Sequence, residues 1–257
     1  MMSAPNSLSL VSVGGGSQTM VLVHGFTQTG ASWLPLVEEL RLLIPDTRFL
    51  LVDLPGHGAS TDISADLRTT ADLLVSVGGP AIYVGYSLGA RVVLHAALQQ
   101  PNVLESCVLI SGTPGITDDK ERAQRRASDE LLADRILTIG TRDFIDEWLR
   151  QPLFATLSPS QDRRDERYAN NAEGLADSLR TSGTGTQSPL WDLLKDCYVP
   201  MLLVAGSLDT KFRDIASQMG DVLPDARTAI IDRAGHSAHL ERPAAVAQVI
   251  ATFLEDS

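Results

Sequence analysis

The chain has 257 residues, of which 44% are hydrophobic and 21% are charged, and its formal net charge is −11. A chain of this length and composition is globular and can bury about three quarters of its unfolded surface around one large core. Nucleic acids and anionic membranes recruit basic patches, so the acidic balance argues against both as partners. No apolar run reaches the roughly 18 to 20 residues that span a bilayer, and the two cysteines are too few for a disulfide framework. We therefore expect a cytoplasmic protein without a membrane-inserted segment.

Short apolar runs that end in turn-forming residues alternate with helix-like segments along the chain. Runs rich in leucine and β-branched residues are typical of strands buried on both faces of a parallel sheet. We expect strands over residues 19–23, 48–52, 81–84, 106–110, 201–205 and 227–231. We expect helices over residues 31–43, 64–77, 88–99 and 244–253. The alternation predicts an α/β fold with a mostly parallel, doubly wound sheet.

This alternation stops between residues 113 and 197, where no convincing buried strand is found. The stretch carries charged segments of helical periodicity over residues 118–139 and 141–148. We interpret it as a helical cap, residues 113–197, inserted into a core formed by residues 1–112 and 198–257. Caps of this kind close over a site and exclude water. The glycines at 14–16 predict a loop or hairpin, because no phosphate-binding GxxxxGK[ST] pattern surrounds them.

A GxSxG pattern, Gly85-Tyr86-Ser87-Leu88-Gly89, follows the expected strand 81–84 and opens the expected helix 88–99. A nucleophile elbow needs this context, a sharp strand-to-helix turn whose glycines let neighbouring backbone pass close to a strained serine. GxSxG alone arises by chance in many chains, and an ordinary turn of small residues is the alternative. The context favours Ser87 as the catalytic serine of an α/β-hydrolase fold.

A serine hydroxyl needs an imidazole base that is oriented by a carboxylate, and in this fold the chain order is serine, acid, histidine. Asp209 and His236 each follow an expected strand, at the sheet edge where open α/β sheets bind ligands. We therefore predict a triad of Ser87, Asp209 and His236. The oxyanion hole is expected from the backbone N–H groups of Leu88 and of Phe26, which lies in the loop after an earlier strand.

Other residues compete for these roles. His239 lies three residues beyond His236 and is the alternative base, while Asp53 and Asp232 are weak alternatives for the acid. His57 lies in an expected turn, and His95 falls in mid-helix, where packing or a surface position is the ordinary interpretation.

Further motifs give the chain a more specific resemblance. It resembles the 2-succinyl-6-hydroxy-2,4-cyclohexadiene-1-carboxylate (SHCHC) synthases of menaquinone biosynthesis over nearly its whole length. The motifs of the core are shared by much of the superfamily, whereas those of the cap are more discriminating. Ala90 is a departure, since glycine is expected after the elbow. The residues that carry the resemblance are His24-Gly25-Phe26-Thr27, Trp33, Asp53-Leu54-Pro55-Gly56-His57-Gly58, Gly85 to Gly89, Arg91, Glu121-Arg122, Arg125, Asp129, Trp148, Gln151-Pro152-Leu153-Phe154, Gly183-Thr184-Gly185-Thr186-Gln187, Trp191, Asp209-Thr210-Lys211-Phe212, Gly235-His236 and His239.

The resemblance implies a lyase that eliminates pyruvate from 2-succinyl-5-enolpyruvyl-6-hydroxy-3-cyclohexene-1-carboxylate, with no metal or organic cofactor. This small anionic substrate carries three carboxylates, and guanidinium groups bind carboxylates through pairs of hydrogen bonds. We expect Arg91, Arg125 and Arg167 to bind it. Three further side chains are expected to shape the pocket, namely Tyr86, Trp148 and Gln151, with core packing as the alternative for Trp148.

Charge alone does not establish this role, because the arginines at 122, 125, 126 and 135 could form a solvated helix face. One rival function is a carboxylesterase or carbon–carbon bond hydrolase in which Ser87 is a nucleophile. A second rival is a non-catalytic module that binds a ligand.

Overall fold

A central sheet of seven strands forms the core of the computed structural model, which describes residues 7–256. The strand order is β1-β3-β2-β4-β5-β6-β7, and β1 is antiparallel to β3 whereas all the other pairs are parallel. The strands are β1 (Leu10–Gly14), β2 (Gln18–Val23), β3 (Thr47–Val52), β4 (Ala81–Tyr86), β5 (Leu104–Ile110), β6 (Met201–Gly206) and β7 (Ala226–Ile231).

The predicted mostly parallel α/β architecture is confirmed, and all six expected strands are present within a few residues of their expected bounds. Strand β1 was not predicted from the sequence. This strand lies at the edge of the sheet, where Val11 is 64% exposed, so it lacks the apolar run that marks the buried strands. Because β1 and β2 both pair with β3 and not with each other, the glycines at 14–16 form a loop rather than a hairpin.

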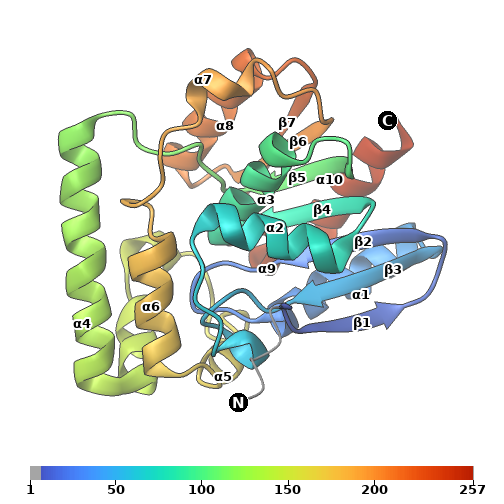
Figure 1. Ribbon diagram of the computed structural model, residues 1–257. Coiled ribbons are helices and arrows are strands. Elements are labelled where there is room, and N and C mark those ends of the chain that lie inside the picture. The colour runs from blue at the N-terminus through green and yellow to red at the C-terminus, as the bar shows by residue number, and fades with distance from the viewer. Residues whose placement is uncertain (1–6, 257) are drawn as a thin grey trace.

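Helices cover both faces of the sheet (Figure 1). Alternate residues of each strand face opposite sides, so Val21 and Val23 join one apolar cluster while Met20 and Leu22 join the other. The first cluster includes residues of α2 (Leu67–Gly78), α3 (Leu88–Gln99) and α8 (Thr210–Val222). The second includes residues of α1 (Leu34–Leu43), α9 (Ala238–Glu241) and α10 (Pro243–Glu255). Two short 3-10 helices, η1 (Gly30–Trp33) and η2 (Gly58–Ser60), lie in the connections after β2 and β3.

Between β5 and β6 the chain is helical and contains no strand among the described residues. We refer to residues 113–197 as the cap segment, and its division from the core stays a prediction. Its helices are α4 (Asp119–Leu149), η3 (Pro152–Phe154), α5 (Arg164–Arg167), α6 (Ala172–Ser182) and α7 (Trp191–Leu194). Gly140 interrupts α4 with a φ of 80° and a ψ of 167°, between the two helical segments expected from the sequence.

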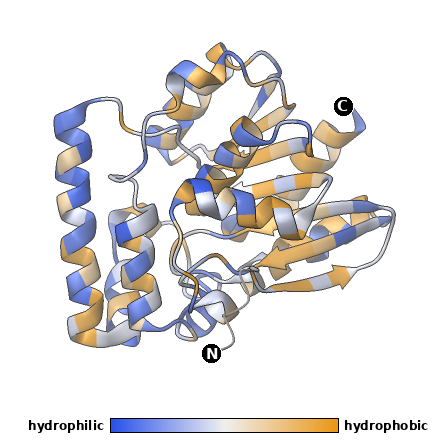
Figure 2. Cartoon of the chain, viewed as in Figure 1, coloured by the Kyte–Doolittle hydropathy of each residue, from blue (hydrophilic) through white to orange (hydrophobic). Residues whose placement is uncertain are grey.

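The cap segment has a small apolar core of its own between α4 and α6, which lie side by side in Figure 1. Ile136 and Phe144 of α4 pack there with Leu175 and Leu179 of α6. Figure 2 shows that the strands of the central sheet are mostly hydrophobic, whereas the N-terminal half of α4 is largely hydrophilic. Within residues 7–256 no helix is both long and apolar enough to cross a membrane.

Candidate active site

Ser87 lies at the sharp turn between β4 and α3, with φ of 51° and ψ of −104°. This backbone conformation is strained for a residue with a side chain. Its surroundings explain the flanking glycines, because a Cβ atom on Gly89 would lie 2.0 Å from the Val23 carbonyl oxygen. A Cβ atom on Gly85 would lie 2.4 Å from the Gly89 carbonyl oxygen. The tight backbone packing therefore holds Ser87 in the geometry of a nucleophile elbow.

The structure brings Asp209 and His236 together with Ser87. His236 Nδ1 lies 2.7 Å from Asp209 Oδ2, and His236 Nε2 lies 3.2 Å from Ser87 Oγ. An ionised carboxylate only accepts hydrogen bonds, so Nδ1 carries the proton and Nε2 is free to accept the serine proton. Asp209 is also the N-cap of α8, where its Oδ1 accepts from the Phe212 N–H at 3.3 Å. His236 and Asp209 are both buried.

The competing residues lie in other surroundings. His239 is buried between the rings of Trp33 and Tyr86, and within the described chain neither of its ring nitrogens has a hydrogen-bond partner. Asp53 accepts from the backbone N–H groups of residues 30 and 59, which orders the loops around it. Asp232 is exposed and pairs with the neighbouring arginine. Within the part of the chain that the structure describes, none of these three side chains hydrogen bonds to Ser87, whose hydroxyl pairs with His236.

The other three histidines are buried, and burial lowers the pKa of each. His57 lies in the turn before η2, and burial lowers its pKa to about 3. His24 lies directly after β2, and burial lowers its pKa to about 4. Mid-helix His95 is packed rather than exposed, and burial also lowers its pKa to about 4.

The two residues predicted to supply the oxyanion donors, Phe26 and Leu88, line the same cavity as Ser87. The Leu88 N–H is the first of α3, and the first four N–H groups of a helix have no partner within it. Phe26 lies in the loop of residues 24–29, which we call the oxyanion loop. The N–H groups on either side are engaged, since Gly25 donates to Gln28 Oε1 at 3.1 Å and Thr27 donates to His57 Nε2 at 3.2 Å. The Phe26 N–H between them donates to no atom of residues 7–256.

A cavity of about 170 Å³ opens at Ser87. Six other residues that were predicted for the site line it together with Ser87, namely Phe26, Leu88, Arg91, Arg125, Trp148 and His236. Arg125 and Trp148 enter the lining from α4 of the cap segment. The remaining lining residues are Leu153, Ser178, Leu179, Ser182, Gly183, Thr184, Lys211 and Phe212. The cavity therefore lies between the sheet edge and the cap segment.

Sequence reasoning missed several of these lining residues. Lys211 and Phe212 belong to the motif Asp209-Thr210-Lys211-Phe212, so their position next to Asp209 could have identified them as site residues. Ser178 and Ser182 lie four residues apart on α6, and nothing in their local sequence marks them. Their role depends on how α6 packs over the sheet, which no short motif contains.

Two arginines of the cavity differ in their partners. Arg91 is 6% exposed and forms no ion pair within residues 7–256; its Nη1 donates to Gln187 Oε1 at 3.4 Å. Burial lowers the pKa of Arg91 to about 9, which leaves it charged at neutral pH. Arg125 donates through Nε to the buried carboxylate of Asp129 at 2.8 Å. Arg91 is thus a buried cation that an anionic ligand could neutralise.

Three other predicted substrate-binding residues are not among those that line this cavity. The Tyr86 hydroxyl lies 2.8 Å from Ser237 Oγ, and its ring packs against His236 at a centroid distance of 5.4 Å. Gln151 precedes η3. Arg167 is 1% exposed and hydrogen bonds to the Thr27 hydroxyl. Direct contact of these three residues with a ligand stays a prediction.

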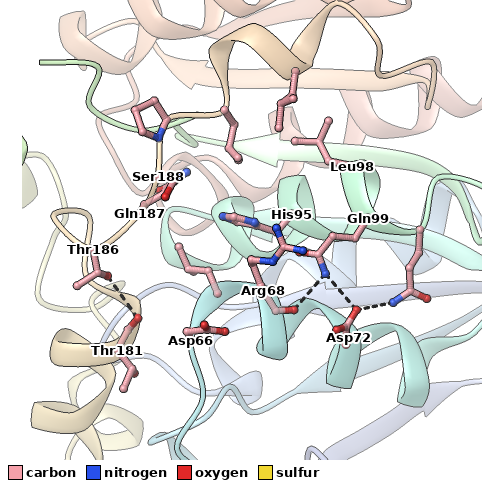
Figure 3. Close-up of a pocket in the computed structure, with 15 residues that line it drawn as sticks. Asp66, Arg68, Asp72, His95, Leu98, Gln99, Thr181, Thr186, Gln187 and Ser188 are labelled. Carbon is pink, nitrogen blue, oxygen red and sulfur yellow. Dashed lines mark hydrogen bonds between the residues drawn. The ribbon is translucent and has the colours of Figure 1, made fainter. Parts of the chain in front are cut away.

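A larger cavity, about 590 Å³, lies elsewhere (Figure 3). It is lined by residues of α2, α3 and the stretch before α7, and none of the predicted triad is among them. Figure 3 shows His95 and Gln99 of α3 in its wall, opposite Thr186 and Gln187. Gln187 also bonds Arg91, so this one side chain lies between the two cavities. Size alone therefore does not locate the chemistry.

Comparisons with known proteins agree with this geometry. The model of the Alpha/beta hydrolase family matches residues 20–249. The SHCHC synthase of Salmonella heidelberg (strain SL476) is 34% identical over 247 residues, which cover 93% of this chain and 94% of that protein. The chain belongs to the SHCHC synthase family of α/β hydrolases. A Bacillus subtilis (strain 168) member of this family is 35% identical over 257 residues and 93% of this chain.

A solved structure of the family gives the same result. The structure of MenH from S. aureus superposes with a TM-score of 0.88 at 28% identity, covering 96% of this chain and 98% of that one. The predicted α/β-hydrolase fold and the resemblance to SHCHC synthases are thereby confirmed.

We predict that the burial of His24 and His57 makes the folded protein less stable in acid. The folded-state pKa values of His24 and His57, about 4 and about 3, lie below the ordinary value of 6.5. Between pH 6.5 and about 4 the unfolded chain therefore binds more protons than the folded chain. As the pH decreases through this range, the free energy of unfolding should decrease by about 1.4 kcal/mol per pH unit for each of these histidines.

Urea unfolding of the wild type and of His57→Gln across this pH range tests the prediction. The variant should show a slope that is shallower by about 1.4 kcal/mol per pH unit, because one buried neutral imidazole is absent. Equal slopes would show that His57 is not held neutral.

Proposed function

We propose that the protein is a lyase that eliminates pyruvate from 2-succinyl-5-enolpyruvyl-6-hydroxy-3-cyclohexene-1-carboxylate to give SHCHC, in menaquinone biosynthesis. The observation that carries the proposal is the cavity at Ser87, which joins a serine–histidine–aspartate array to two arginine side chains. Relatives named SHCHC synthase match nearly the whole chain, which supports the same activity here.

Ser87, His236 and Asp209 act together as a base. His236 Nε2 takes the proton of Ser87, and the serine oxygen removes a ring proton next to the succinyl carbonyl. The electrons of the broken C–H bond form a double bond between ring carbons 2 and 3. The existing ring double bond shifts from carbons 3 and 4 to carbons 4 and 5, and the C–O bond from carbon 5 to the enolpyruvyl group breaks. Pyruvate leaves as its enolate and takes up a proton. No acyl-enzyme forms, because the serine attacks a hydrogen and not the carbonyl carbon.

The Phe26 and Leu88 N–H groups stabilise the charge that develops during this step. When the ring proton leaves, negative charge moves onto the succinyl carbonyl oxygen and gives a dienolate. Two backbone donors without other partners can bind that oxygen, and such donors cost no reorganisation at the moment of reaction. They are more effective in a cavity from which water is excluded.

Arg91 and Arg125 are proposed to bind carboxylates of the substrate. Arg91 comes from the helix that begins after Ser87, and Arg125 comes from α4 on the opposite wall of the cavity. A bound carboxylate would offset the cost of burying the Arg91 guanidinium. The cavity of about 170 Å³ is smaller than the roughly 300 Å³ at which ligand pockets usually start, but a second cavity of about 360 Å³ shares Arg125 and Phe212 with it and provides further space for the substrate.

The same triad could instead acylate Ser87 in an esterase, and a strained serine turn is common to both chemistries. The arginine side chains favour an anionic substrate over a neutral ester. A cytoplasmic location belongs to the proposal as well; the two buried free cysteines are consistent with a reducing compartment.

Pyruvate release from the enolpyruvyl substrate tests the proposed activity. The wild type should release one pyruvate per SHCHC formed, and Ser87→Ala should lose about a thousandfold or more in kcat because the base is removed. A coupled assay for pyruvate measures both. If the wild type hydrolyses activated esters but releases no pyruvate, the lyase assignment is wrong.

Arg126, the next residue of α4, is a matched control for Arg125. Arg125 lines the cavity, whereas Arg126 is exposed and is not among the lining residues. Arg125→Ala should lower kcat/KM for the tricarboxylate by about tenfold to a hundredfold, and should change kcat/KM for a neutral ester far less. Arg126→Ala should match the wild type on both substrates. Equal losses on both substrates in Arg125→Ala would indicate a structural role for this arginine.

A further inference from the structure

Thr27 follows Phe26 in the oxyanion loop and has a φ of 69°. Residues with a branched Cβ rarely adopt a positive φ, and such a conformation persists only where the surroundings fix it. Thr27 is also completely buried. The neighbouring side chains must therefore hold this backbone in place.

Three side chains bind Thr27 at three different atoms. Its N–H donates to His57 Nε2 at 3.2 Å, and its carbonyl oxygen accepts from Asn170 Nδ2 at 2.8 Å. Its hydroxyl oxygen accepts from Arg167 Nη1. All three side chains are more than nine-tenths buried, so water does not compete for these bonds.

The partners of Thr27 are themselves fixed. His57 Nδ1 lies 2.9 Å from the Pro55 carbonyl oxygen, which places the ring proton on Nδ1 and leaves Nε2 as an acceptor. Asn170 Oδ1 accepts from the Gly58 N–H at 2.8 Å, so its amide cannot rotate without losing a bond on each side. The contacts connect the cap segment to the turn at residues 55–58 and to the oxyanion loop.

Arg167 is an unusual member of this set, because it forms no ion pair within residues 7–256 and its Nη2 has no hydrogen-bond partner there. Burial lowers its pKa to about 10, so it stays charged at neutral pH. An uncompensated buried cation is costly, and negative charge that develops at the oxyanion loop during the reaction would offset part of that cost.

We propose that His57, Arg167 and Asn170 are positioning residues that hold Thr27 and thereby aim the Phe26 N–H at the reacting oxygen. This inference rests on the proposed function. It concerns the contact of Arg167 with the oxyanion loop, and direct contact of Arg167 with a substrate carboxylate stays a prediction. Because Arg167 and Asn170 belong to the cap segment, the position of this segment sets the geometry of the oxyanion hole.

Neighbouring asparagines provide the test. Asn170→Ala removes the bond to the Thr27 carbonyl, whereas Asn171→Ala removes only the N-cap of α6, which accepts from the Gly174 N–H at 2.6 Å. Asn170→Ala should lower kcat about tenfold to a hundredfold and change KM by less than about twofold, because the oxyanion donor acts mainly in the transition state. Asn171→Ala should lower the melting temperature and keep the wild-type kcat.

A second substitution separates positioning from a general loss of structure. If Asn170→Ala does not fold, Thr27→Val replaces it, because valine has the shape of threonine and removes only the acceptor for Arg167. Thr27→Val should then lower kcat about tenfold at a nearly unchanged KM.

A wild-type kcat in Asn170→Ala, or a raised KM at unchanged kcat, would overturn the inference. A wild-type kcat in Thr27→Val would also overturn it. If instead the proposed function is wrong, the wild type itself releases no pyruvate. The failure of the proposed function can therefore be distinguished from the failure of this inference. In that case the same variants are measured on an activated ester, whose hydrolysis uses the same oxyanion donors, with the same expected losses.

Discussion

The hydrogen bond between His236 Nδ1 and the Asp209 carboxylate, at 2.7 Å, is the interaction on which the site depends. It fixes the tautomer of the imidazole, and only that tautomer presents an unprotonated Nε2 to Ser87. Asp209 is oriented in turn by the first turn of α8, through the Phe212 N–H. In the proposed mechanism the basicity of Ser87 therefore depends on the junction between β6 and α8, which holds Asp209.

The sheet explains why these groups meet. Because β2, β4, β6 and β7 are parallel, the oxyanion loop, Ser87, Asp209 and His236 all follow strands at the same edge. The cap segment adds Arg125 and Trp148 from above and contacts the oxyanion loop through Arg167 and Asn170. In the proposed account the position of this segment therefore affects both the substrate cavity and the geometry of the oxyanion hole.

Much of this arrangement could be predicted from the sequence because it depends on local signals. Buried strands carry continuous apolar runs, and Asp209 and His236 follow two of those runs in the order that the fold requires. The exposed edge strand β1 has no such run. The position of Arg167 could not be predicted, because sequence spacing does not say whether a cap side chain turns toward the cavity or toward the oxyanion loop. The positive φ of Thr27 has no sequence signal, since threonine disfavours it.

The central claim is that Ser87 removes a proton and is never acylated, and intact-protein mass spectrometry during turnover tests it most directly. Samples of the 27.6 kDa enzyme are quenched with acid while the enolpyruvyl substrate is being consumed. The account predicts one species at the unmodified mass at every time point, with pyruvate accumulating. A heavier species that forms and decays during turnover, with the added acyl group mapped to Ser87, would contradict it.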